Sequence, residues 1–140
     1  MENNQKIILN ELRKNPKNKI ARICKHHNIP LKDSTIDYID LRSNFITKFT
    51  WLVNFAKLGY PIHVHLKFKA QNPYKIKDII RLNDFINSAY RLNDNNFYIE
   101  CLFKNMNEYS TFREYLKDND ATDINVHHII EDISREQFVF

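Results

Sequence analysis

The chain has 140 residues, of which 43% are hydrophobic and 13% aromatic, and its formal net charge is +4. This length and apolar content suit one compact domain or two small ones and exclude an intrinsically disordered chain. No apolar run approaches the roughly 20 residues that cross a bilayer, and the first residues, MENNQKIILNELRK, lack the order of a signal peptide, so we expect a cytoplasmic protein without a membrane partner.

The positive charge is concentrated in the first third of the chain. Residues 1–48 contain ten Lys or Arg and five Asp or Glu, a net charge of +5, whereas residues 49–140 contain eleven and twelve, a net charge of −1. A basic end on a near-neutral body is typical of a polyanion-binding module joined to a second domain. A solvated charged surface is the alternative. Cys24 and Cys101 lie far apart without a C-x-x-C motif, which favours two ordinary thiols over a disulfide or a zinc site.

Apolar spacing predicts three helices in residues 1–48. The first contains Ile8 and Leu12 and ends at NPKN (15–18), and the second is short, from Ile20 to about His27. After the tight connection NIPL, the sequence KDSTIDYIDLRSN (32–44) predicts the third. Such an arrangement is typical of a helix-turn-helix. Alternating residues in NFITKFTWLVNF (44–55) then predict an extended strand.

The third helix carries its own expectations. Asp33 or Ser34 is a suitable N-cap. Ile36 and Ile39 are expected to face the core.

From residue 61 the apolar period changes to two. PIHVHLKF (61–68) predicts a half-buried strand, and NPYKIKDIIRLNDF (72–85) predicts a helix with Pro73 in its first turn. Two strands (86–93 and 96–104) joined by an Asn-Asp-Asn turn, a helix (105–119) and a last strand (123–133) follow. The order βαββαβ predicts a ferredoxin-like domain, with two helices covering one face of a four-stranded antiparallel sheet. The other face is then solvated or covered by a partner.

Three segments resemble the Lrp/AsnC family of transcription regulators, chiefly its archaeal type: NFIT (44–47), AKLGYP (56–61) and RLNDNNFYIE (91–100). The resemblance covers essentially the whole chain. It implies an α+β protein with a winged helix-turn-helix followed by a ferredoxin-like effector domain, the RAM domain. The corresponding division is 1–48 for the DNA-binding domain, 49–60 for a linker strand and 61–140 for the domain that binds effectors and oligomerises.

The resemblance implies a transcription regulator that binds double-stranded DNA as a homodimer, which can assemble into an octamer. The third helices enter successive major grooves, and the effector domains pair sheet to sheet. The residues expected to contact phosphates are Lys14, Lys17, Lys19, Arg22 and Lys25, and those expected to contact bases are Lys32, Ser34, Thr35, Tyr38 and Arg42.

The third helix departs from the family pattern because it carries Asp33, Asp37 and Asp40. A carboxylate near a phosphate weakens DNA binding. The alternative is therefore an oligomerising or ligand-sensing protein whose degenerate helix-turn-helix binds DNA weakly or not at all. Neither hypothesis requires a cofactor. No glycine-rich phosphate loop or nucleophile motif is present, so an enzyme is not expected.

Gly59 is the single glycine of the chain. Where the family often has glycine, this chain has Asn44 and Asn93, and Asn is the residue besides glycine that best tolerates the left-handed region. We therefore expect a positive φ and a hinge at Gly59, where the linker enters the effector domain.

The small-molecule effector implied by the family binds near a Gly-Asp-x-Asp hairpin and the last strand. The matching residues here are Asn93, Asp94, Asn96 and Asn125, with Asn96 in place of the second acid. Because polar groups are depleted at these positions, the sequence leaves open whether the ligand differs from the family's amino acids or is absent.

His63, His65 and His127 are expected on one face of the sheet, on neighbouring strands. Three imidazoles there are a candidate transition-metal site or a pH-sensitive contact. Without a tight ligand spacing, polar surface or interface residues are the simpler interpretation, and no bound metal is expected.

Overall fold

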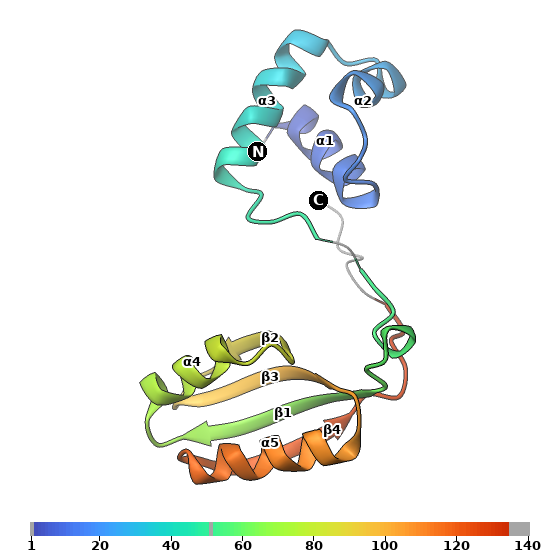
Figure 1. Ribbon diagram of the computed structural model, residues 1–140. Helices are drawn as coiled ribbons and strands as arrows, with labels where there is room; N and C mark the ends of the chain where they lie inside the picture. The colour runs from blue at the N-terminus through green and yellow to red at the C-terminus, as the bar shows by residue number, and fades with distance from the viewer. Residues whose placement is uncertain (1, 51, 135–140) are drawn as a thin grey trace. The chain divides into compact units, whose positions relative to one another are not determined.

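The computed structural model describes residues 2–50 and 52–134. Contacts divide them into two compact units, one up to Leu52 and one from Val53 to Ile133. The first unit is helical, and the second contains a four-stranded sheet with two helices (Figure 1). The predicted α+β fold class is confirmed.

The N-terminal unit consists of α1 (Asn3–Lys14), α2 (Ile20–His27) and α3 (Leu31–Asn44), in the order and close to the positions predicted. Ile8 and Leu12 of α1 pack with Ile23 of α2 and Leu41 of α3 in a small core. Asn28 ends α2 in the left-handed conformation, with φ of 53°, so α3 begins only three residues after it. This short connection is the turn of a helix-turn-helix.

The orientation of α3 corrects the prediction for its apolar residues. Ile36 and Ile39 are 62% and 60% exposed, whereas Leu41 is fully buried. The helix begins at Leu31, so neither Asp33 nor Ser34 caps it. Because Leu41 rather than the isoleucines packs against α1 and α2, the apolar residues of α3 follow two different faces. This explains their irregular spacing.

The segment between the two units differs from the expected strand. Residues 46–50 and 52–54 form neither helix nor strand. An extended segment forms a strand only when another strand pairs with its backbone. Alternating apolar residues alone were therefore not sufficient to predict a strand here. A short 3-10 turn, η1 (Ala56–Leu58), follows.

Gly59 has the positive φ that was predicted, at 91°. It ends η1, where the Tyr60 N–H donates to the Phe55 carbonyl oxygen at 3.0 Å. A Cβ at this position would meet no atom within 4 Å, so the requirement for glycine comes from the backbone conformation and not from crowding. Asn44 and Asn93 have no positive φ; in the hairpin, Asp94 and Asn95 take it instead.

The C-terminal unit has the predicted βαββαβ order (Figure 1). Its elements are β1 (Ile62–Ala70), α4 (Pro73–Leu82), β2 (Ile86–Arg91), β3 (Asn96–Phe103), α5 (Met106–Asp118) and β4 (Ala121–His128). The antiparallel sheet has the order β2-β3-β1-β4, so the first and third strands are central. Asn72 and Asn105 cap α4 and α5 by accepting backbone N–H bonds.

Alternation along the two central strands separates the core from an uncovered face. Val64, Leu66 and Phe68 of β1 and their counterparts on β3 pack with the apolar residues of α4 and α5. On the opposite face of these strands lie His63, His65, Lys67, Lys69, Tyr98 and Glu100.

Cys24 and Cys101 are both buried and unbridged. Burial raises the pKa of the Cys101 thiol to about 12, which keeps it protonated and unreactive. Among the helices of the described residues, none is sufficiently long and apolar to cross a membrane.

Leu41→Ala and Ile39→Ala test the orientation of α3, because they truncate neighbouring positions of one helix. We expect Leu41→Ala to lower the free energy of unfolding by about 2–5 kcal/mol, since it opens a cavity in the core. Ile39→Ala should change it by less than about 0.5 kcal/mol. Urea unfolding followed by circular dichroism measures both. Equal losses, or a greater loss for Ile39→Ala, would contradict the orientation of α3.

Candidate functional site

The cations predicted to contact phosphates lie in and around α1 and α2. Lys14 ends α1, Lys17 and Lys19 belong to the connection, and Arg22 and Lys25 lie one turn apart on α2. All five side chains are exposed. Lys14 is partly neutralised, because its Nζ lies 3.1 Å from Oε1 of Glu11. That hydrogen bond lowers the pKa of Glu11 below its usual value, against a smaller opposing effect of burial.

Arg22 and Lys25 line a shallow depression between α1 and α2. Its volume is about 550 Å³, and Glu11, Asn18, Ile23 and His26 complete its lining. His27 lies beside it, with Nε2 3.6 Å from Oε1 of Glu11. The depression therefore contains two strong cations, an imidazole and one carboxylate.

The outward face of α3 contains part of the predicted base-contacting set. Helical periodicity places Lys32, Thr35 and Arg42 on the same exposed side as Ile36 and Ile39. The Thr35 hydroxyl donates to the Leu31 carbonyl oxygen at 2.8 Å, within the helix.

Two members of that set are less exposed than the prediction requires. Ser34 is completely buried, so it cannot contact a base from this conformation. Its hydroxyl oxygen has no hydrogen-bond partner within the described part of the chain. Tyr38 packs in part against the core of the N-terminal unit, which limits its reach outward.

The carboxylates of α3 lie on a flank of the helix. Asp33, Asp37 and Asp40 are spaced by four and three residues, so they share one side, about a quarter turn or more from the outward face. Asp40 is engaged locally. Its Oδ2 accepts from Nε2 of Gln5 on α1 at 3.0 Å, and its Oδ1 accepts from Nδ2 of Asn44 at 2.7 Å. The sequence alone did not show that the carboxylates lie apart from the cations of the outward face, because it predicted the wrong inward face for α3.

The four residues predicted to bind an effector lie in two places: three at the β2–β3 hairpin and the start of β3, and one on β4. Asn93 and Asp94 form the β2–β3 hairpin, and Asn96 begins β3, where it pairs in register with Lys69. Asn125 lies on β4 opposite Lys67. Asn96 and Asn125 therefore flank β1 on opposite sides, at positions two residues apart.

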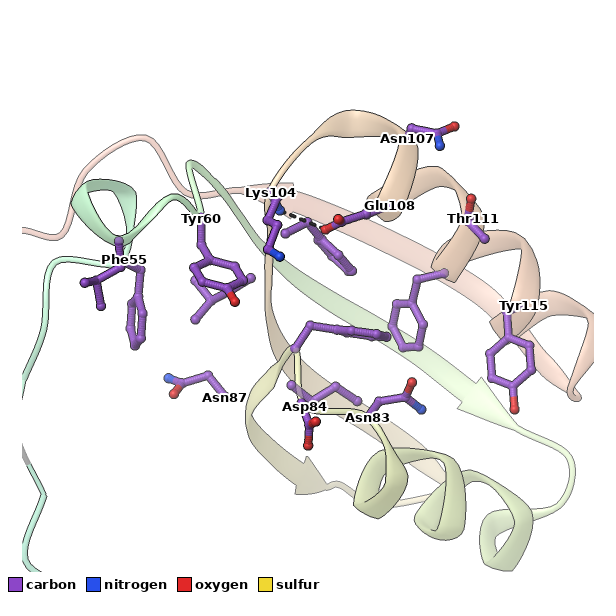
Figure 2. Close-up of a pocket in the computed structure, with 16 residues that line it drawn as sticks. Phe55, Tyr60, Asn83, Asp84, Asn87, Lys104, Asn107, Glu108, Thr111 and Tyr115 are labelled. Atoms are coloured by element: carbon purple, nitrogen blue, oxygen red, sulfur yellow. Dashed lines mark hydrogen bonds between the residues drawn. The ribbon is translucent and has the colours of Figure 1, made fainter.

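A groove elsewhere in the C-terminal unit was missed by sequence reasoning. Its volume is about 860 Å³, and it lies among η1, the α4–β2 connection, the end of β3 and α5 (Figure 2). Phe55, Phe85, Leu102 and Phe112 supply apolar walls. None of the four predicted effector residues lines it.

Polar groups lie around this groove. Lys104 and Glu108 lie on one side of it, and Asn83 and Asp84 lie on the other (Figure 2). The Lys104 ammonium is 5.7 Å from the centre of the Tyr60 ring, which is a cation–π distance. An apolar cleft with a few polar groups of both signs is typical of small-molecule sites. Segments far apart in the sequence line the groove together, so no spacing in the sequence reports it.

The uncovered face of the sheet brings together His63, His65 and Glu100. Nε2 of His63 lies 2.8 Å from Oε1 of Glu100, and the two side chains are only 13% and 14% exposed. His65 is the register partner of Glu100, and its Nδ1 is hydrogen-bonded to the Tyr98 hydroxyl. His127 is the register partner of His65 on β4, but it is not part of this close group.

The environment of Glu100 favours its ionised form. Burial alone raises the pKa of this carboxyl, but hydrogen bonds from Asn87, Ser88 and His63 outweigh it, and the pKa is lowered from the usual 4.5. Asn87 donates to Oε2 at 2.8 Å, so the two carboxylate oxygens have different partners. Sequence reasoning placed the histidines on this face but did not identify Glu100 as their partner.

No family model and no curated protein sequence matches the chain. Solved structures do match it. LrpC of B. subtilis is 17% identical, over 96% of this chain and 97% of that chain, with a TM-score of 0.86. E. coli AsnC is 12% identical over 99% and 97%, with a TM-score of 0.76. A transcriptional regulator from Neisseria meningitidis in complex with L-Met is 12% identical over 96% and 93%, with a TM-score of 0.82.

These structural neighbours are Lrp/AsnC-family transcription regulators and not enzymes. At such low identity the similarity concerns the fold, which extends over nearly the whole length of both chains. The chain thus has the fold of Lrp/AsnC-family regulators, with a helix-turn-helix unit and a ferredoxin-like unit.

Glu100→Gln tests the polar cluster through its pH dependence. A carboxyl whose pKa is lowered by folding stabilises the folded state above its unfolded pKa, and this contribution is lost as pH falls through the folded value. We therefore expect Glu100→Gln to be less stable than the wild type at pH 7, with the difference shrinking below about pH 4.5. Denaturant unfolding at several pH values measures it. The control Asp78→Asn removes a carboxylate from the exposed pair with Arg81, and it should have little effect. A pH-independent difference for Glu100→Gln would contradict this explanation.

Proposed function

We propose that the chain is a cytoplasmic DNA-binding transcription regulator of the Lrp/AsnC type, which acts as a dimer or larger oligomer and responds to a small molecule. The observation that carries this proposal is the surface of the helix-turn-helix. Exposed cations on α2 accompany an outward face of α3 that has a cation near each end and no carboxylate along it.

The distribution of side chains on α3 suits contact with a major groove. Lys32 and Arg42 lie about three turns apart along the helix and can each reach a phosphate or a base edge. Between them, Thr35, Ile36 and Ile39 present methyl groups, which contact the thymine methyl group. Core packing does not explain why Ile36 and Ile39 are apolar, because both are exposed in the N-terminal unit, whereas contact with DNA would explain it.

The acidic residues of α3 limit affinity without preventing binding. Asp40 is held by Gln5 and Asn44, on the flank of the helix and not on its outward face. The flanking carboxylates still lie within a Debye length of any bound phosphate, which is about 10 Å at 0.1 M salt. We therefore expect modest affinity, with the exposed cations of α2 supplying much of the phosphate contact.

Dimer formation is proposed from apolar surface near the linker. Phe45, Phe49 and Leu52 are 46–59% exposed although they follow each other within eight residues. Such a run of exposed apolar side chains is a recognised mark of an interaction site. A second copy is the partner we propose, because a paired linker strand would also satisfy the backbone groups of residues 46–50 and 52–54, which belong to no helix or strand among the described residues.

The small molecule is proposed to bind in the groove of Figure 2 and not at the β2–β3 hairpin. The groove has the size of small-ligand sites, which span about 300–1,000 Å³, and it combines apolar walls with Lys104, Asp84 and Glu108. Groups of both signs suit an amino acid, whose carboxylate and ammonium need opposite partners. One structural neighbour is a complex with L-Met.

The alternative is an oligomeric ligand-binding protein whose helix-turn-helix no longer binds DNA. The carboxylates Asp33 and Asp37 beside the outward face favour it. Binding to random duplex DNA separates the two functions. Affinity that falls steeply with salt supports the regulator, and absence of binding even at low salt supports the alternative.

Substitution of the α2 cations gives a quantitative test. In a salt titration of duplex binding by the full chain, Arg22→Ala and Lys25→Ala should each weaken affinity for all sequences and reduce the log–log slope by about 1. Arg42→Ala should instead lower the preference for a selected site.

The matched control is Lys117→Ala, which removes one exposed cation from α5 in the other unit. It should leave the slope unchanged. Equal effects of Lys117→Ala and Arg22→Ala would contradict the proposed surface, because they would indicate only a dependence on net charge.

Calorimetric titration with the twenty amino acids tests the groove. For any amino acid that binds, Lys104→Ala and Asp84→Asn should each weaken affinity by about 10-fold or more, because each leaves a ligand charge unpaired. Asp94→Asn and Asn125→Ala are the controls, at the hairpin and on β4. Loss of binding in the controls with retention in the groove variants would place the ligand at the hairpin instead.

A further inference from the structure

The uncovered sheet face holds three metal-ligand side chains in a close group. One ligand atom from each of His63, His65 and Glu100 lies within 4.8 Å of the other two. The first two alternate with core residues on β1, and Glu100 is opposite His65 on β3. All three side chains are partly buried. Two regular, paired strands therefore fix the positions of all three donors.

From this arrangement we propose that His63, His65 and Glu100 form a binding site for a divalent transition metal ion of the Zn²⁺ class. Two imidazoles and one carboxylate are a donor set that zinc uses when it keeps one position for water or another ligand. Imidazole donors disfavour Mg²⁺ and Ca²⁺, which prefer oxygen ligands. The site is assigned by geometry within one chain and does not depend on DNA binding.

The separations are close to what an ion requires. With bonds of about 2.0–2.1 Å and tetrahedral angles, donor atoms around zinc lie roughly 3.3 Å apart. The His63–Glu100 pair, at 2.8 Å, is shorter than this, and the group as a whole extends to at most 4.8 Å. Small side-chain rotations would therefore equalise the distances without any change in the strands.

Neighbouring groups orient two of the proposed ligands. The Tyr98 hydroxyl is hydrogen-bonded to Nδ1 of His65, and Asn87 donates to Oε2 of Glu100, leaving Oε1 as the oxygen that faces His63. Hydrogen bonds of this kind fix the rings and carboxylates of metal sites.

An ion pair between His63 and Glu100 is the simpler explanation of their contact, but it does not account for the whole group. An ion pair needs no second imidazole, yet the ring of His65 lies 5.5 Å from that of His63, centre to centre. Its hydroxyl partner and its register opposite Glu100 hold it there.

Zinc titration of the full chain after removal of metal by a chelator tests the proposal. Competition with a fluorescent zinc indicator should show one site per chain. His63→Ala, His65→Ala and Glu100→Gln should each weaken the affinity by at least about 10-fold, and Tyr98→Phe, which acts through His65, by about 10-fold. His128→Gln is the matched control, because this exposed imidazole on β4 packs edge to face against Tyr109, on the other side of the sheet.

A second measurement requires no substitution. In NMR spectra of the wild type, zinc should shift the ring nitrogen signals of His63 and His65 and leave those of His128 unchanged.

For the titration of the variants, circular dichroism without metal shows which of them fold. Shifts confined to other histidines, such as the adjacent His26 and His27, would overturn the proposal, as would equal weakening by His128→Gln or absence of stoichiometric binding.

Discussion

Side chains of β1 alternate between a core covered by α4 and α5 and a face that no element of the unit covers, and this alternation sets what each face can do. Val64, Leu66 and Phe68 must remain apolar because they join the helices to the sheet. The intervening residues are free of that requirement. The same pleat that buries the apolar set therefore holds His63 and His65 beside Glu100, and one slip in register would exchange the two faces.

An equivalent division governs the helical unit. Leu41 and the buried Ser34 fix the rotation of α3 against α1 and α2. That rotation places Lys32 and Arg42 outward with the isoleucines and moves the carboxylates to a flank. Composition alone presents α3 as acidic, whereas its orientation separates the two kinds of charge. The proposed DNA surface follows from packing in the core of the unit, and a change in that packing would alter the surface.

Much of the fold could be predicted because most segments have a clear period. The alternation of β1, the Pro73 start of α4 and the buried residues of α5 left few alternatives, and the positive φ of Gly59 followed from its being the single glycine. The prediction for α3 failed because Ile36 and Ile39 are exposed, and sequence spacing alone does not distinguish an exposed apolar residue from a core residue. The prediction of a linker strand failed for a related reason. Alternating apolar residues do not provide the neighbouring strand with which an extended segment must pair.

The candidate sites were predicted less completely. The sequence placed two of the three proposed metal ligands, His63 and His65, on one face of the sheet. It did not predict Glu100 beside them, because this proximity depends on the β1–β3 register. The groove depends on contacts between distant segments, which no local pattern reports.

The central claim is that the helix-turn-helix contacts DNA, and backbone NMR of the full chain with and without duplex DNA tests it most directly. We expect shifts at the outward positions of α2 and α3. Shifts confined to the C-terminal unit, or none at low salt, would contradict it.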